Sequence, residues 1–262
     1  MEHDLGGTAG GSLVLEFLGL PGSGKSRLSQ MVAGELRSRG VAVSEPTFTI
    51  STTRPVTSRL ARKLRYALDG GRGIPTNGHY WTRWILASRQ RELADLGRHS
   101  LNWYYVVGMM RRCGAVPGVH VFDQGLFQAL WSFGYGASAP TAAMADGTAL
   151  RHNMAAVLPP RLVVVRLEVS RPVIVERLTE RINGEWRSGR SRLERHLRTG
   201  TVEPALARAA SALQQIDRLA CELEQRQRIT LVQVDNEDLA ALHTNAAALA
   251  DTITDLLGVP AA

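Results

Sequence analysis

A glycine-rich segment near the N-terminus, G-L-P-G-S-G-K-S at residues 19–26, constrains the fold more than any other part of this 262-residue chain. The mostly apolar run before it, residues 13–18, is typical of a buried parallel strand. The pattern after it predicts a helix over residues 27–39 that is closed by Gly40. The segment therefore predicts an α/β fold in which the first strand passes through a tight loop into a helix.

The spacing G-x-x-x-x-G-K-[ST] has a chemical meaning, because it is the pattern of a phosphate-binding loop. Backbone N–H groups of such a loop converge on phosphate oxygens, and the N-terminus of the following helix adds partial positive charge. Lys25 is predicted to reach the β- and γ-phosphates, and Ser26 to ligate Mg²⁺. The alternative is an ordinary glycine-rich turn. The predicted nucleotide-binding residues are Gly19, Leu20, Pro21, Gly22, Ser23, Gly24, Lys25, Ser26 and Arg27.

The rest of the chain alternates between strand and helix patterns. After residues 13–18, further strands are predicted over residues 41–44, 119–123, 162–167 and 229–234. Helices are predicted over residues 56–68, 80–96, 101–112 and 239–257, and after Pro172. Pro46 is expected to force an extended exit from the second strand. This alternation predicts a three-layer, doubly wound α/β domain with a parallel five-stranded sheet over residues 12–258, after a flexible leader over residues 1–11.

Basic residues are concentrated in two places. The chain has 31 Lys and Arg against 24 Asp and Glu, a formal net charge of +7. Residues 54–112 hold 12 basic and 3 acidic residues, and residues 177–198 hold 7 and 3. Two separate clusters indicate two places that meet anions, rather than one nucleic-acid-binding stripe. Only two of the 31 basic residues are lysines, Lys25 and Lys63.

Targeting and redox signals are lacking in this sequence. Its N-terminus is acidic where a secretory signal needs positive charge, and no apolar run approaches the ~18 residues that span a bilayer. Two cysteines are too few for a disulfide framework or a cysteine-based zinc site. A cytoplasmic location is therefore expected.

The order of these features resembles the P-loop nucleoside and nucleotide kinases, particularly the deoxynucleoside and thymidylate kinases. The resemblance spans about residues 13–257. It is carried by the loop at residues 19–26, Glu45-Pro46 after the second strand, F-D-Q-G at residues 122–125, and R-S-G-R-S-R-L-E at residues 187–194. It implies transfer of the γ-phosphate of ATP, with Mg²⁺, to a small-molecule acceptor.

The resemblance also implies roles for individual residues. Glu45 matches the carboxylate that accepts the acceptor's hydroxyl proton, although a solvated loop residue is the alternative. Asp123 matches the acid that helps hold Mg²⁺, with a helix N-cap as the alternative. Three arginines in the segment 177–198 match a lid that closes over the phosphates, or else form a solvated face: Arg187, Arg190 and Arg192.

The sequence departs from the family at Gln124, where those kinases carry an arginine that touches the acceptor. Residues 54–115 form a helical insertion that is expected to bind the acceptor instead. Its aromatic residues and nearby arginines suit a planar or anionic acceptor, with burial in the core of the helical layer as the alternative for the aromatics. These residues are Trp81, Trp84, Trp103 and Trp131, with Tyr80, Tyr104, Tyr105, Arg83, Arg89 and Arg91. A membrane-surface or partner-binding face is the alternative for Arg59, Arg62, Lys63 and Arg65.

The leading hypothesis is thus an ATP-dependent kinase of a nucleoside or nucleotide. The second keeps the fold and changes the acceptor to an antibiotic or sugar hydroxyl, which Gln124 favours. The third is an ATP-binding regulatory protein, although Asp123 lacks the adjacent second acid that many motor ATPases use. A homodimer remains an open alternative.

Overall fold

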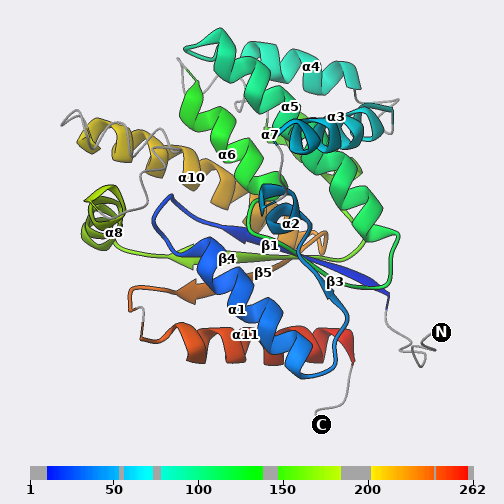
Figure 1. Ribbon diagram of the computed structural model, residues 1–262. Helices are drawn as coiled ribbons and strands as arrows, with labels where there is room; N and C mark the ends of the chain where they lie inside the picture. Colours follow the sequence, from blue (N-terminus) through cyan, green and yellow to red (C-terminus); the bar gives the residue numbers. More distant parts are fainter. Residues whose placement is uncertain are drawn as a thin grey trace.

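A five-stranded, all-parallel sheet forms the centre of the computed structural model, which describes residues 11–52, 56–72, 78–137, 147–183, 202–238 and 240–258. The strand order is β2-β3-β1-β4-β5 (Figure 1). The strands are β1 (Ser12–Leu18), β2 (Val43–Ser44), β3 (Gly118–Phe122), β4 (Leu162–Glu168) and β5 (Thr230–Asp235). The prediction of an α/β fold with a parallel five-stranded sheet is therefore confirmed.

Helices cover both faces of the sheet (Figure 1). One face is covered by α1 (Lys25–Ser38) and α11 (Leu242–Leu257). The other face is covered by α5 (Leu93–Gly114), α6 (Leu126–Gly136) and α10 (Val202–Gln225). The other helices of the described ranges are α2 (Pro46–Thr52), α3 (Val56–Arg72), α4 (Gly78–Ala87), α7 (Gly147–Val157) and α8 (Arg171–Asn183).

The central strand β1 divides its side chains between the two faces. Leu13, Leu15 and Phe17 are buried in the core that contains α1 and α11. Val14 and Leu18 are buried in the core that contains α5, α6 and α10. Successive side chains of a strand point to opposite faces, so Glu16 belongs to the second series and is fully buried with it.

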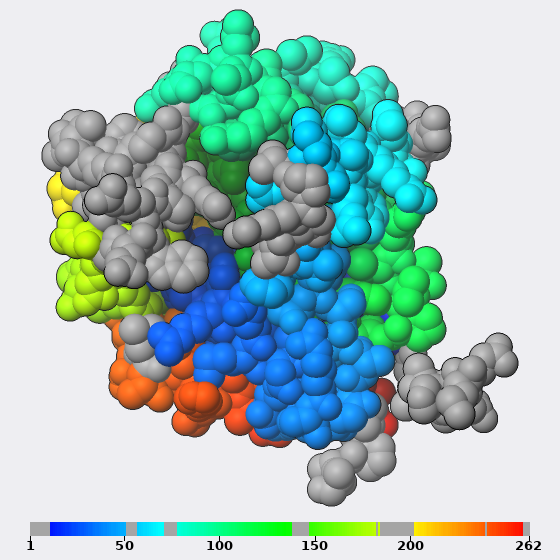
Figure 2. Space-filling model, in the orientation of Figure 1, coloured from blue at the N-terminus to red at the C-terminus, as the bar shows by residue number. Residues whose placement is uncertain are grey.

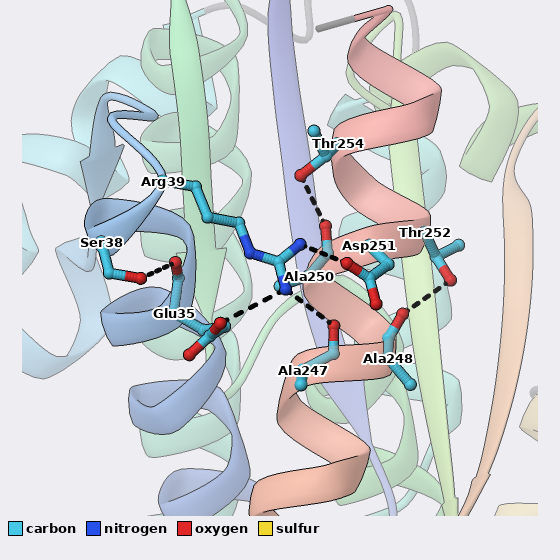
Figure 3. Close-up of polar contacts among 9 residues, drawn as sticks. All are labelled: Glu35, Ser38, Arg39, Ala247, Ala248, Ala250, Asp251, Thr252 and Thr254. Atoms are coloured by element: carbon cyan, nitrogen blue, oxygen red, sulfur yellow. Dashed lines mark hydrogen bonds and ion pairs between the residues drawn. The ribbon is translucent and has the colours of Figure 1, made fainter. Parts of the chain in front are cut away.

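An arginine joins the first and last helices of the described chain. Arg39, which follows α1, donates to the Asp251 carboxylate on α11 at 2.6 Å and to Glu35 at 3.3 Å (Figure 3). It also donates to the Ala247 carbonyl at 3.3 Å. Because α11 follows the last strand β5, this group helps to hold α11 against α1 beneath the sheet.

Two local predictions were wrong. Pro46 is the first residue of helix α2 rather than part of an extended exit, because a proline is tolerated where the helix N–H has no intrahelical partner. The helix predicted over residues 80–96 ends at Ala87, and α5 begins already at Leu93. The break between them is held from outside, since the Gln90 side chain donates to the Phe133 carbonyl on α6 at 3.0 Å.

Two glycines allow α3 and α5 to cross with their backbones in contact. A Cβ atom on Gly70 would lie 2.1 Å from the Tyr104 carbonyl oxygen, and one on Gly108 would lie 2.0 Å from that of Tyr66. Such distances are far inside van der Waals contact. The α3 helix can therefore lie this close to α5 only because both positions lack a side chain.

We predict that Gly108→Ala destabilises the protein by about 1 to 3 kcal/mol or more, because the added methyl group forces the two helices apart. Urea denaturation followed by circular dichroism measures the change. Gly97→Ala on the same helix is the matched control, since a Cβ there meets nothing within 4 Å. That control should gain up to about 1 kcal/mol from helix propensity. Equal effects of the two substitutions would contradict the proposed crossing.

Candidate functional site

The glycine-rich loop makes the turn that its sequence predicts. Gly22 and Gly24 have φ angles of 90° and 89°, in the left-handed region that favours glycine. Gly24 is the N-cap of α1, with no side-chain cap, and the first turn of α1 carries no acidic residue. The positive end of the α1 dipole is therefore not neutralised by a side chain of its own helix, which favours an anion at this position.

Two buried amide side chains form hydrogen bonds with the backbone of the loop. The Gln128 carboxamide oxygen, on α6, accepts from the Gly19 N–H at 3.4 Å. The Asn236 side chain, after β5, donates to the Ser23 carbonyl at 2.7 Å. A Cβ on Gly24 would lie only 2.6 Å from the Asn236 Nδ2 atom, so this glycine also makes room for the Asn236 side chain. The loop conformation thus depends on residues from distant parts of the chain.

Lys25 lies within the loop and folds back onto it. Its Nζ atom donates to the carbonyls of Gly19 at 2.7 Å and Leu20 at 2.9 Å. Burial lowers the pKa of Lys25 to about 7, the nearby Asp123 carboxylate opposes this shift, and Arg181 and Arg166 reinforce it. A lysine whose charge is disfavoured in this way gains from an arriving anion.

The loop and the third strand meet through one hydrogen bond. The Ser26 hydroxyl, in the first turn of α1, donates to Oδ2 of Asp123 at 2.9 Å. Asp123 does not cap α6, because the N-cap residue of that helix is Gly125. Within the described residues, no cluster of three or more His, Cys, Asp or Glu side chains offers a metal site. A hydroxyl beside one carboxylate suits Mg²⁺, which takes few protein ligands and completes its shell with phosphate oxygens and water.

A cleft of about 330 Å³ opens beside Asp123. Residues of the helical insertion, 54–115, form most of its wall. Figure 2 shows α3 at the surface above α2 and α1. The residues that line the cleft are Thr47 and Ile50 from α2, Arg59, Leu60 and Lys63 from α3, Asn102, Tyr105 and Val106 from α5, and Asp123 and Gln124.

The predicted base Glu45 is placed beside this cleft rather than in its lining. Its carbonyl accepts from the Thr49 N–H at 2.9 Å, so Glu45 directly precedes helix α2 and accepts a hydrogen bond from its first turn. Its carboxylate accepts from Arg37 on α1 at 2.7 Å, and the side chain is 13% exposed. Glu45 is therefore an ion-paired residue close to Thr47, which does line the cleft.

The four tryptophans of residues 81–131 are buried in the core, so the alternative interpretation is confirmed for them. Trp81 and Trp103 are fully buried, with ring centroids 4.2 Å apart. An acceptor platform built on Trp81 is therefore wrong. Arg83, Arg89 and Arg91 are exposed and do not line the cleft.

The basic residues of α3 are divided between two faces. Arg59 and Lys63 line the cleft, whereas Arg62 and Arg65 are exposed on the outer side. The three lid arginines, Arg187, Arg190 and Arg192, lie outside the described residues. In the part of the chain that the structure describes, no helix has both the length and the apolar character needed to cross a membrane.

One supporting residue was not found by sequence reasoning, although a charge inside an apolar strand was its signal. The Glu16 carboxylate accepts from the Gln128 N–H at 2.9 Å, at the start of α6. A Cβ on Gly125 would lie 2.4 Å from Glu16 Oε2, so the glycine lets the carboxyl group approach. Glu16 thus supports the helix that carries Gln128 and follows directly after Asp123.

A scan of protein-family models finds none that matches this chain, and a search of curated proteins likewise finds no match.

Burial gives Glu16 a measurable effect on stability. It raises the pKa of Glu16 from 4.5 to about 8, against the opposing effect of hydrogen bonds from the first-turn amides of α6. The unfolded chain then releases a proton above pH 4.5 that the folded chain keeps up to about pH 8. The stability that depends on this proton is complete at low pH and is lost as the pH rises through this window.

We predict that Glu16→Gln removes this loss. Between pH 5 and 8 the free energy of unfolding of the variant, relative to the wild type, should rise by up to about 1.4 kcal/mol per pH unit. Urea denaturation at several pH values measures the slope, and a constant offset from the substitution does not affect it. Parallel curves for the two proteins would show that Glu16 is charged in the fold.

Proposed function

We propose that this chain is an ATP-dependent phosphotransferase of the P-loop kinase type, which moves the γ-phosphate to a small-molecule acceptor, most simply a nucleoside or nucleotide. The observation that carries the proposal is the hydrogen bond between Ser26 and Asp123. It joins a glycine-rich loop at a helix N-terminus to a carboxylate that lines a cleft. This arrangement supports a nucleotide on one side of Asp123 and an acceptor on the other.

The residues of the loop fit a bound triphosphate. Lys25, Arg166 and Arg181 bring positive charge to the loop, and the start of α1 adds its dipole. Ser26 and Asp123 would hold Mg²⁺. When bound, MgATP supplies the phosphoryl group, which the acceptor hydroxyl takes while ADP leaves and the hydroxyl proton passes to a carboxylate. Arg187, Arg190 and Arg192 remain the candidates for a lid over the phosphates.

Two carboxylates are candidates for that proton. Asp123 lines the cleft, but its carboxylate already accepts a hydrogen bond from Ser26 and would also ligate Mg²⁺. Glu45 does not line the cleft, and its carboxylate is paired with Arg37. A base needs an available lone pair rather than a metal, so we assign proton acceptance to Glu45 and metal binding to Asp123.

An alternative acceptor, such as an antibiotic or sugar hydroxyl, is favoured by Gln124, which lines the cleft at the position where the resembled kinases carry arginine. An ATP-binding regulatory protein would not need a cleft beside the metal position, so the cleft favours an enzyme.

We predict that Lys25→Ala abolishes phosphoryl transfer and leaves the fold intact, because no other residue of the loop can place a point charge at the β- and γ-phosphates. Transfer is measured as ADP formation with a panel of hydroxylated acceptors, and folding by circular dichroism. Binding of a non-hydrolysable ATP analogue is compared by calorimetry. Turnover at the wild-type rate would rule out a P-loop mechanism.

We predict that Glu45→Gln lowers turnover by about 10² to 10⁴ and leaves ATP affinity nearly unchanged, because the amide keeps the size of the side chain and cannot accept the proton. Arg37→Gln is the matched control, since it breaks the same ion pair and retains the carboxylate. The control should keep most of the activity. A loss below about threefold in Glu45→Gln would move the role to Asp123 or to no residue.

A further inference from the structure

The cleft has two walls of opposite charge. Arg59 and Lys63 lie one turn apart on the inner face of α3, and Asp123 stands at the end of β3. The four-residue spacing places both cations on the same side of the helix. A ligand that fills the cleft therefore meets positive charge toward α3 and negative charge toward the loop.

Lys63 is held in a place that disfavours its own charge. It is half-buried, and burial together with the neighbouring Arg59 lowers its pKa. Its Nζ atom lies 5.2 Å from the centroid of the Tyr105 ring, which also lines the cleft. Among the described residues, no carboxylate forms an ion pair with it. Two cations brought together in this way are relieved by an anion between them.

Lysine is rare in this chain, so its presence at position 63 is informative. The chain uses arginine at 29 of its 31 basic positions, and its other lysine is in the glycine-rich loop. Lysine presents a compact point charge, whereas arginine presents a planar fork. At about 330 Å³ the cleft is at the lower end of the range for small-molecule sites, which suits a single small metabolite.

We infer that the acceptor is an anionic hydroxylated small molecule, whose phosphate or carboxylate group binds Arg59 and Lys63 while its hydroxyl group lies toward Asp123. This inference rests on the proposed function and specifies its substrate class. It also accounts for Gln124, because the cation that an anionic acceptor needs comes from α3 instead of from the residue after Asp123.

The scarcity of lysine makes a direct test possible. Reductive methylation with ¹³C-formaldehyde labels Lys25, Lys63 and the N-terminal amine and keeps their charge, and Lys63→Arg assigns the signals. A non-hydrolysable ATP analogue with Mg²⁺ should shift the Lys25 signal. With that analogue bound, the anionic probes should shift the Lys63 signal. The probes are uridine 5′-monophosphate, glucose 6-phosphate and glycerate, each compared with its neutral counterpart uridine, glucose or glycerol.

The two proposals fail differently in this experiment. If the ATP analogue leaves Lys25 unshifted, the proposed function fails. If Lys25 responds and no anionic probe shifts Lys63, or the neutral probes shift it equally, only the anionic acceptor is overturned. Comparing phosphate with carboxylate probes tells which anion is preferred. A true anion site should also weaken between 50 mM and 500 mM salt, because exposed charges are then screened.

A pair of variants on the same helix tests the role in catalysis. For the anionic acceptor that turns over, Lys63→Gln should raise the acceptor KM about tenfold or more and leave the KM for ATP unchanged. Lys63→Arg should keep most of the affinity, which separates loss of charge from loss of folding. Arg65→Gln removes the same charge from the outer face of α3 and should change the acceptor KM by less than about twofold. Equal effects of Lys63→Gln and Arg65→Gln would overturn the inference.

Discussion

The parallel pairing of β1 with β3 and β4 is the constraint on which the candidate site depends. In this register Glu16 lies beside Phe122, so Asp123 leaves β3 at the same edge at which β1 passes into the glycine-rich loop. All strands run in the same direction, so their carboxyl ends gather along that edge. This common edge allows the Ser26–Asp123 hydrogen bond and the hydrogen bond from Asn236, after β5, to the Ser23 carbonyl. A site assembled from four distant segments is therefore held by the backbone ladder of one sheet.

Two helix N-termini, those of α6 and α1, lie at this edge of the sheet and differ in the side chains that their N–H groups bind. The start of α6 is occupied by the Glu16 carboxyl group, which the β1 strand delivers from the core. The start of α1 has neither a side-chain cap nor an acid in its first turn. A backbone N–H group at the start of α6 therefore already bonds to a side chain of the protein, whereas the start of α1 favours an anion. This difference supports α1, and not α6, as the place for a phosphate group.

The acceptor side depends on a packing detail rather than on a motif. Gly70 and Gly108 bring the backbones of α3 and α5 into contact, and this contact sets which side of α3 faces inward. As a result Arg59 and Lys63 line the cleft, while Arg65 is turned to solvent. The proposed preference for an anionic acceptor thus rests on the same helix crossing that the glycine substitutions test. Stability and specificity are linked at this point, because a shift of α3 would move both cations.

Local patterns in the sequence were sufficient for the sheet and the loop. Mostly apolar runs that end next to a glycine, an aspartate or a glutamate predicted the five strands, and the spacing of glycines with Lys25 and Ser26 predicted the turn into α1. These features are local because a strand, a turn and a helix cap each depend on a few neighbouring residues. Contacts between distant residues decided the rest. The break before α5 is held by Gln90 on Phe133, the tryptophans are core because α4, α5 and α6 pack together, and Lys63 reaches the cleft because Gly70 meets α5. A charged or aromatic side chain has the same sequence pattern whether its helix turns it inward or outward, so only the tertiary packing could assign Arg59, Lys63 and the tryptophans to their places.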